Sequence, residues 1–216
     1  MFDLTLYKVN EAFIKVDCEK SIAQELHSYF SFRVPGYQFV PAYKNRVWDG
    51  YIRLFSLKEF TLYHGLVPYI ETFCKERGYT LQIQSDINST ENYSVVEAEK
   101  FISTLNLPHQ VRDYQLKSFI HAVRNKRILL LSPTASGKSL IIYLIFRQLH
   151  LYQNMKGLII VPTTSLVEQL YSDFDDYASF NDFNVEDKVH RIYQGKEKHT
   201  NKPLTVSTWQ SLYQMP

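Results

Sequence analysis

Cysteines and long apolar runs are scarce in this chain of 216 residues, and each shortage excludes a class of protein. The two cysteines, Cys18 and Cys74, have no second Cys or His at zinc-ligand spacing, which argues against a disulfide framework and a structural zinc site. No apolar run reaches the length of a membrane span, and Asp3 and Lys8 interrupt what would have to be a signal peptide. We therefore expect reduced core or boundary thiols in a cytoplasmic protein without a membrane partner.

Net charge is also small, because 24 Lys and Arg residues are nearly balanced by 22 Asp and Glu residues. The resulting formal charge of +2 decides nothing about nucleic acid, since binding depends on local clusters of cations. The chain is 45% hydrophobic and 15% aromatic. At this length, such a content predicts a folded protein with two modest cores and so two domains.

The first part of the chain predicts a compact α/β unit, because alternating apolar residues indicate strands and apolar residues at helical spacing indicate helices. The predicted strands are residues 4–9, 12–16, 38–43, 47–55 and 79–83, and the predicted helices are residues 19–30 and 66–77. Residues 84–93 are polar and lack a hydrophobic period, which is typical of a connection between domains. We therefore predict an N-terminal α+β domain over residues 1–84 and a second domain over residues 85–216.

In the second part, strands and helices alternate, which predicts a parallel sheet with helices on both faces. The predicted strands are residues 127–131, 157–161, 189–193 and 204–207. The predicted helices are residues 95–105, 113–125, 138–152 and one marked by Leu166, Leu170 and Phe174. Residues 128–131 and 158–161 are continuously apolar, as expected for strands covered on both faces.

A short polar segment between the strand at 128–131 and an apolar helix has the context of a phosphate-binding loop. The segment is Ser132, Pro133, Thr134, Ala135, Ser136, Gly137, Lys138 and Ser139. Backbone N–H groups from Thr134 onward would face the phosphates, and Gly137 would keep the backbone free of a Cβ. Lys138 would reach the β- and γ-phosphates and Ser139 would hold Mg²⁺, so we predict an ATP site.

Ser132 stands where the general pattern has its first glycine, so an ordinary strand-to-helix turn is the alternative. The segment resembles motif I of superfamily 2 helicases, in which a small residue commonly replaces that glycine. Three more segments follow in the order of that superfamily: residues 112–115 resemble the Q motif, 161–169 motif Ia and 205–210 motif Ib. The resemblance implies a partial RecA-like second domain that uses ATP and Mg²⁺ to act on DNA as a helicase.

The same resemblance implies roles for single residues. Gln115 would grip the adenine edge and Arg112 would lie beside the nucleotide. Contacts to the sugar-phosphate backbone of a nucleic-acid strand are implied for Thr163, Thr164, Ser165, Gln169, Thr208 and Gln210. The alternatives are a plain helix start at residues 112–115 and a helix cap formed by Thr163 or Thr164.

From residues 48–55 onward, the chain also resembles phage recombination helicases within this superfamily. This resemblance implies unwinding or branch migration of branched DNA, including R-loops with their RNA–DNA hybrid, forks and junctions, in recombination, repair and replication. An RNA helicase stays open, because contacts to phosphates do not distinguish the sugars. A restriction-enzyme motor subunit and a non-catalytic nucleic-acid-binding module with a residual nucleotide loop stay open as well.

Hydrolysis in this superfamily also needs an Asp-Glu pair at the end of an apolar strand and arginines from a second RecA-like domain. After Ser139, the paired acids are Asp175-Asp176, on the polar side of a predicted helix, and Glu186-Asp187, ahead of a strand. The sequence stops soon after motif Ib, so we expect part of a longer enzyme. We expect this chain alone to bind ATP weakly and to hydrolyse it negligibly.

A group of cations in the first domain is interleaved with aromatic residues. The cations are Lys44, Arg46, Arg53 and Lys58, and the aromatic residues are Tyr43, Trp48, Tyr51 and Phe55. A cationic hairpin with aromatics can grip phosphates while it stacks on unpaired bases, which predicts a DNA-substrate recognition domain. The alternative places the aromatics in the core and the charges at a solvated sheet edge.

Overall fold

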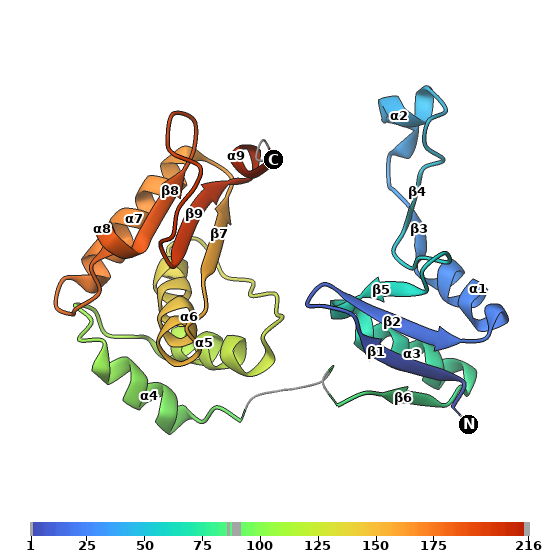
Figure 1. The fold of residues 1–216 in the computed structure, drawn as a ribbon, viewed down its shortest axis with the longest axis horizontal. Coiled ribbons are helices and arrows are strands. Elements are labelled where there is room, and N and C mark those ends of the chain that lie inside the picture. Colours follow the sequence, from blue (N-terminus) through green and yellow to red (C-terminus); the bar gives the residue numbers. More distant parts are fainter. Residues whose placement is uncertain (1, 86, 88–91, 214–216) are drawn as a thin grey trace. The chain divides into compact units, whose positions relative to one another are not determined.

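A computed structural model describes residues 2–85, 87 and 92–213 of the chain (Figure 1). The chain divides into two compact units, Met1–Ser89 and Thr90–Pro216. Residues 86 and 88–91 at this junction lie outside the described residues, so the domain boundary after residue 84 stays a prediction. None of the helices in the described ranges is both long and apolar enough to cross a membrane.

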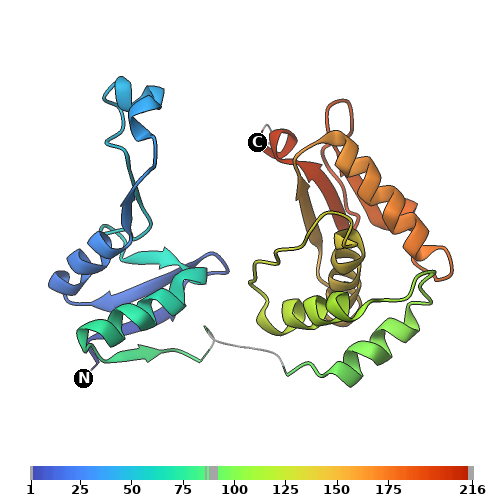
Figure 2. The ribbon, with the colours of Figure 1, turned by 180° about the vertical axis from the view of Figure 1, so that it is seen from behind.

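The core of the first unit combines a four-stranded sheet, of order β5-β2-β1-β6, with two helices. The elements are β1 (Leu4–Lys8), β2 (Phe13–Cys18), α1 (Lys20–Tyr29), β5 (Thr61–Tyr63), η2 (His64–Leu66), α3 (Val67–Arg77) and β6 (Leu81–Ile83). Alternation along β1 and β2 turns Leu4, Leu6, Ile14 and Val16 into the core, where they join buried residues of α1 and α3. Figure 2 shows α3 lying across the sheet. Gly78 ends α3 in the left-handed conformation.

Residues 31–53 leave this core and form a projecting arm (Figure 1). Its stem pairs β3 (Ser31–Arg33) with β4 (Tyr51–Arg53), and its head contains η1 (Tyr37–Phe39) and α2 (Pro41–Lys44). The strand predicted at residues 38–43 is therefore wrong, and the strand predicted at 47–55 is reduced to β4.

Local backbone chemistry explains this correction. Pro41 is the first residue of α2, a position that suits the fixed φ and missing N–H of proline. Gly36 turns the chain ahead of η1 with a left-handed φ of 73°. The strands that the sequence did not predict, β3 and β5, have three residues each and are too short to show alternation.

The second unit is built on a parallel sheet of order β7-β9-β8, which confirms the predicted parallel α/β fold. Its elements are α4 (Val95–Thr104), α5 (Asp113–Asn125), α6 (Lys138–Gln153), β7 (Gly157–Val161), α7 (Thr164–Ala178), α8 (Val185–Lys188), β8 (Val189–Ile192), β9 (Leu204–Thr208) and α9 (Trp209–Tyr213). Helix α7 contacts all three strands and α6 packs against α7. The buried stripe of α7 contains Val167, Leu170 and Phe174, so Val167 takes the place predicted for Leu166.

Two expectations about apolar strands are wrong. Residues 127–131 form an irregular segment, in which Leu131 is 89% exposed. A continuously apolar strand needs pairing partners on its sides, and no strand among the described residues pairs with this segment. In β7, Leu158 and Ile160 are each 55% exposed, so helices do not cover both faces of that strand.

Candidate nucleotide site and nucleic-acid interface

The loop from Ser132 to Ser139 leads directly into α6, the longest described helix of the second unit. Gly137 stands immediately before its first residue and has a left-handed φ of 73°. A Cβ at this position would lie 2.3 Å from Nε2 of Gln115. The backbone here therefore approaches α5 closely and adopts a conformation that only glycine takes without strain.

Polar side chains tie this loop to the start of α5. Buried Gln115 donates from Nε2 to the Ser136 oxygen at 3.0 Å and accepts at Oε1 from the Arg112 N–H at 3.0 Å. The Tyr114 hydroxyl donates to the same Ser136 oxygen at 2.9 Å. The hydroxyls of Ser132 and Ser136 bond to each other at 2.5 Å, so the serine in place of the first glycine adds a hydrogen bond across the loop.

These contacts bear on the roles that the resemblance implies for Gln115 and Arg112. Both ends of the Gln115 amide have partners inside the protein. A contact to adenine would use the remaining hydrogen-bonding capacity of the amide or replace one of these partners. Residues 112–115 also form the start of α5, as in the plain structural alternative. The adenine contact therefore stays a prediction.

Lys138 and Ser139 occupy the first turn of α6. The Lys138 ammonium donates to the Pro133 oxygen at 2.7 Å, so phosphate oxygens would compete with a loop carbonyl for it. The Ser139 hydroxyl is bonded to the Tyr177 hydroxyl at 2.9 Å. Either hydroxyl can donate in this pair, and burial raises the pKa of the Tyr177 phenol above its ordinary value. With Tyr177 as the donor, Ser139 keeps a lone pair for a cation.

A hollow of about 420 Å³ lies beside the loop. It is lined by Pro108, His109, Gln110, Arg112, Gln115, Ala135, Gly137, Leu140 and Tyr177. The rings of His109 and Tyr177 meet edge to face with centroids 6.2 Å apart, and His109 Nε2 lies 2.8 Å from a carboxylate oxygen of Asp176. Sequence reasoning missed these two rings, and only the position of His109 just ahead of the Arg112 segment pointed to either.

The chemistry of this region suits a nucleoside triphosphate with Mg²⁺. An ammonium, a hydroxyl oxygen and the first N–H groups of α6 lie together, and these are the groups that phosphate and Mg²⁺ prefer. The adjacent hollow offers ring faces, an amide and a guanidinium. The residues present therefore fit the predicted cofactors.

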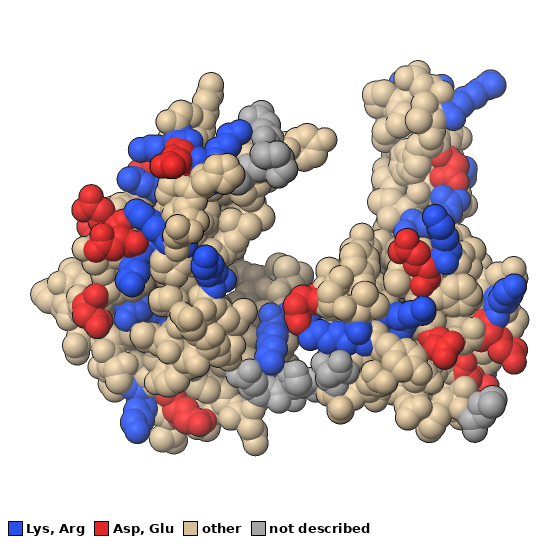
Figure 3. Space-filling model, viewed as in Figure 1, with Lys and Arg blue, Asp and Glu red and all other residues tan. Residues whose placement is uncertain are grey.

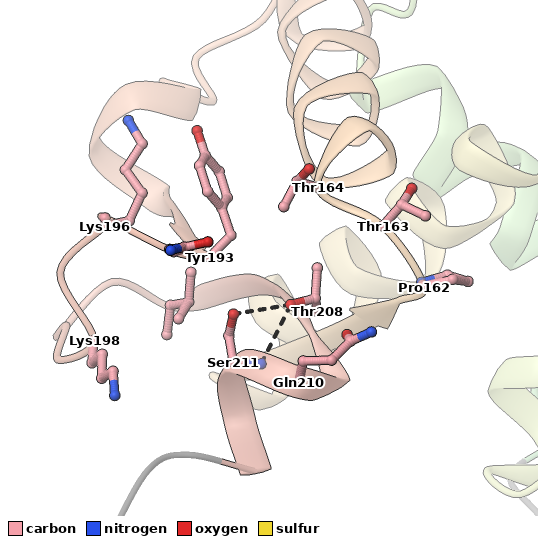
Figure 4. A pocket seen from close by; sticks show the side chains of 12 residues that line it. Pro162, Thr163, Thr164, Tyr193, Lys196, Lys198, Thr208, Gln210 and Ser211 are labelled. Carbon is pink, nitrogen blue, oxygen red and sulfur yellow. Dashed lines mark hydrogen bonds between the residues drawn. The ribbon is translucent and has the colours of Figure 1, made fainter.

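A second hollow, of about 610 Å³, unites the segments that resemble motifs Ia and Ib (Figure 4). It is lined by Pro162, Thr163, Thr164, Ile192, Tyr193, Gln194, Gly195, Lys196, Lys198, Thr208, Gln210 and Ser211. Of the predicted strand contacts, Thr163, Thr164, Thr208 and Gln210 line it, whereas Ser165 and Gln169 do not. Thr163 also caps α7, since its Oγ1 accepts from the Leu166 N–H at 3.4 Å, so its cap role is real as well.

The loop after β8 completes this hollow and was missed by sequence reasoning. The Tyr193 hydroxyl donates to Glu168 of α7 at 2.6 Å, and Arg191 donates to the same carboxylate at 2.5 Å. The bond from Tyr193, followed by that from Arg191, lowers the pKa of Glu168. Lys196 lies 5.6 Å from the Tyr193 ring centre, which brings a cation to the rim. The sequence signal that could have indicated this loop is the glycine between Gln194 and Lys196, just after a strand.

The arm brings together three of the four cations predicted to contact DNA in the first domain. A hollow of about 790 Å³ is lined by Gln38, Tyr43, Lys44, Arg46, Val47, Trp48, Asp49 and Arg53. Lys58 lies outside this lining. Arg53 pairs with Asp49, and this bond lowers the pKa of Asp49 to about 2. Figure 3 shows basic side chains at the head and along the stem of the arm.

The core alternative for the aromatics is right for one residue and wrong for others. Phe55 is buried in the core of the first unit. Trp48 and Tyr51 lie outside that core, on the arm.

Cys74 is buried and Cys18 half-buried, as predicted, and burial raises the pKa of each thiol to about 11.

Comparisons with known proteins agree with both units. Residues 3–84 match the family model described as DNA helicase UvsW, N-terminal, and residues 99–216 match the one described as type III restriction enzyme, res subunit. The chain is 34% identical over 225 residues to the ATP-dependent DNA helicase uvsW of Enterobacteria phage T4, covering 99% of this chain and 43% of that protein. It therefore spans less than half of that relative.

Solved structures show the same likeness. A crystal structure of the UvsW helicase from bacteriophage T4 matches with a TM-score of 0.87 and 33% identity, covering 99% of this chain and 77% of that chain. Another crystal structure of T4 UvsW gives the same TM-score and identity and is covered over 44% of its chain. These matches confirm the predicted fold class, a small α+β unit followed by a partial RecA-like parallel α/β unit.

Proposed function

The chain belongs to the family described as type III restriction enzyme, res subunit, and we propose that it supplies the ATP-binding part and a DNA-binding part of an ATP-dependent DNA helicase. The observation that carries this proposal is the phosphate loop, in which Gly137, Lys138 and Ser139 begin α6 and Gln115 ties the loop to α5. The similarity to a protein described as an ATP-dependent DNA helicase supports it.

Within this function, each group of the nucleotide site has a distinct task. Lys138 neutralises the terminal phosphates, the Ser139 oxygen holds Mg²⁺, and Arg112 and Gln115 orient the nucleoside. The bound Mg²⁺ would supply positive charge against the phosphate oxygens. The hollow between motifs Ia and Ib receives the backbone of a DNA strand, where threonine hydroxyls and Lys196 suit phosphate oxygens. We propose Ser165 and Gln169 as weaker contacts at its edge.

Branched DNA is the proposed substrate, in R-loops, forks and recombination junctions. The support is the match of residues 3–84 to the N-terminal family of a DNA helicase and the arm that this unit carries. Lys44, Arg46, Arg53 and Lys58 of this unit are proposed to contact the DNA. We propose roles in recombination, repair and replication in the cytoplasm of a bacterial host, where such DNA and ATP are both found.

Hydrolysis is proposed to be negligible for this chain by itself. Of its paired acids, Asp175-Asp176 lie in α7 and Glu186-Asp187 lie in α8. Neither pair ends a strand of the parallel sheet, where a carboxylate pair would hold Mg²⁺ and orient water. Binding and turnover are therefore expected to separate in this chain.

A titration with a fluorescent ATP analogue and Mg²⁺ tests the nucleotide site. We expect saturable binding that Lys138→Ala weakens at least about tenfold, because a charge-assisted bond contributes about 1.5–3 kcal/mol. Lys156→Ala, which removes an exposed lysine outside the loop, is the matched control and should bind like the wild type. Phosphate release should stay at the background rate in all three proteins. Equal binding by Lys138→Ala, or robust hydrolysis by the wild type, would contradict the proposal.

Two alternatives to the DNA helicase, a restriction motor and a non-catalytic nucleic-acid-binding module, can be distinguished from it. A restriction motor shares the second unit, but the match of residues 3–84 to a helicase N-terminal family favours the helicase. A non-catalytic nucleic-acid-binding module would bind DNA and show no Lys138-dependent nucleotide binding. Parallel titrations with DNA and RNA duplexes of the same sequence would show which sugar the chain prefers.

A further inference from the structure

The head of the arm exposes two large apolar side chains. Phe39 is 73% exposed and Val47 is 81% exposed, and neither belongs to the core of the first unit. A single exposed apolar residue is ordinary on a protein surface. Here, however, both residues lie on a projecting element together with Lys44 and Arg46, which form no ion pair among the described residues.

The hollow of about 790 Å³ in the arm combines charge with flat rings. Lys44 and Arg46 supply cations, and Val47, Tyr43 and Trp48 supply apolar and aromatic surface. The Trp48 indole donates from Nε1 to the Tyr51 oxygen at 2.8 Å, which holds the ring in one orientation. This chemistry matches a nucleotide, which carries an anionic phosphate next to a planar base.

Stacked side chains stiffen the stem that carries this head. The Arg33 guanidinium lies 4.2 Å from the ring centre of Tyr37 and 5.3 Å from that of Tyr51. Tyr37 in turn meets Tyr43 edge to face at 4.7 Å. Because these contacts run from the stem into the head, the head keeps a defined position on the arm.

On the basis of the proposed DNA function, we propose that the head of the arm binds an unpaired nucleotide at a DNA branch point. The base stacks on Phe39, an exposed ring of the same head that does not line the hollow, while Lys44 and Arg46 of the hollow contact the flanking phosphates. A continuous duplex stacks its bases on one another and offers no base face to Phe39. A branch point exposes such faces, and stacking on an aromatic side chain contributes about 1–3 kcal/mol per base. The arm thereby favours branched over continuous DNA without reading sequence.

Fluorescence anisotropy with the 216-residue chain tests this inference. The probes are a three-way fork and a blunt duplex with the same number of phosphates, at one salt concentration. Phe39→Ala should lower affinity for the fork about 5- to 150-fold and leave duplex affinity unchanged. Phe39→Tyr should restore the preference for the fork. Tyr69→Ala, which removes an exposed aromatic residue of α3 in the same unit, is the matched control and should bind like the wild type.

A 2-aminopurine base at the branch point gives an independent signal. Its fluorescence should be quenched on binding by the wild type and should recover with Phe39→Ala, because the stacking partner is lost. An equal loss of affinity for both DNAs, or no loss, would overturn the inference and leave the proposed DNA function intact. Failure of the wild type to bind either DNA would overturn both. A Phe39-dependent dimer in sedimentation experiments would assign the surface to self-association and also overturn the inference.

Discussion

The phosphate loop and the arm differ in what holds their functional groups. In the loop, Gln115 and Tyr114 fix the backbone of Ser136 through hydrogen bonds, and the loop residues follow a sequence motif. In the arm, ring stacking and one ion pair hold exposed side chains outside the core, and no motif marks them. A triphosphate always presents the same set of anionic oxygens, so a preorganised backbone suits it. The branched DNA that we propose as the substrate varies in shape, and an arm with exposed cations would suit that variety.

Each region nevertheless depends on a glycine with a positive φ. At Gly137 an added Cβ would meet the end of the Gln115 side chain at 2.3 Å, and at Gly50 it would meet the Tyr37 ring at 2.8 Å. The first neighbour is the tip of a flexible side chain, whereas the second is a ring that other side chains hold in place. Alanine at these two positions therefore probes the two regions in parallel.

Gly137→Ala should have the largest effect. Strain at a left-handed φ costs about 1–3 kcal/mol. Displacement of Gln115 also breaks its bond to Ser136, which contributes about 0.5–1.5 kcal/mol. We expect nucleotide affinity to fall at least about tenfold in the fluorescent titration while DNA affinity stays unchanged. Gly78→Ala shares the φ of 73° but meets nothing within 4 Å and lies in the first unit, so it controls for the general effect of a strained backbone on the protein. Equal nucleotide affinity in both variants would show that the contact with Gln115 is unimportant.

Gly50→Ala should disturb the arm and spare the core. Gly50 has a φ of 84°, and the Tyr37 ring that it contacts would have to shift, at a cost of about 1–3 kcal/mol. Because no residue of 31–53 belongs to the core, the urea midpoint should hardly change. Hydrogen exchange should instead become faster in the arm. Gly36→Ala, in the same arm, has its nearest neighbour at 3.9 Å and should show a smaller change. A large drop in the urea midpoint would mean that arm and core fold as one unit.

Charge reversal at Lys44 and Arg46 should have a moderate effect on DNA binding. Each lost phosphate contact flattens the dependence of log affinity on log salt by about 0.9. The double variant should therefore lose about two units of slope and roughly tenfold in affinity at low salt. Lys20→Glu with Lys75→Glu, on exposed positions of α1 and α3, carries the same charge change away from the arm. If both double variants lose the same slope, the effect reflects net charge and not the arm.

Long periodic segments were predictable from the sequence, and short irregular ones were not. The bounds of α5 and β7 agree with the predicted residues 113–125 and 157–161, because several turns or a compact apolar run give a strong local signal. The arm head misled the prediction because its Tyr, Val and Phe content resembles a strand, while Gly36 and Pro41 decide the structure. The strand prediction for residues 127–131 was wrong because a strand needs pairing partners, which the local sequence pattern does not show.

The same distinction applies to the candidate sites. Residues 132–139 could be proposed as a phosphate loop from the sequence, since their chemistry lies in consecutive residues. Tyr177 was not, because its contact with Ser139 joins residues 38 positions apart. The loop after β8 was missed for the same reason, since Glu168 and Tyr193 meet only in the folded chain. Motifs therefore indicate candidate ligand-binding groups and leave out the side chains that contact and position them.

The hollow between the segments that resemble motifs Ia and Ib combines motif residues with a loop that no motif marks. Glu168 positions Tyr193 of that hollow, and Glu168→Gln should have the smallest effect. The pKa of the Glu168 carboxylate is lowered in the folded state, chiefly by the Tyr193 hydroxyl. The bonds of this carboxylate therefore stabilise the protein at pH values above its ordinary pKa of 4.5, and this stabilisation is lost as the pH falls through the lowered pKa. Solvent screening keeps this contribution below about 1 kcal/mol. Glu168→Gln should lower the urea midpoint slightly at pH 7, and the difference should vanish at a pH below the lowered pKa. A difference that persists there would assign the effect to packing and not to the carboxylate.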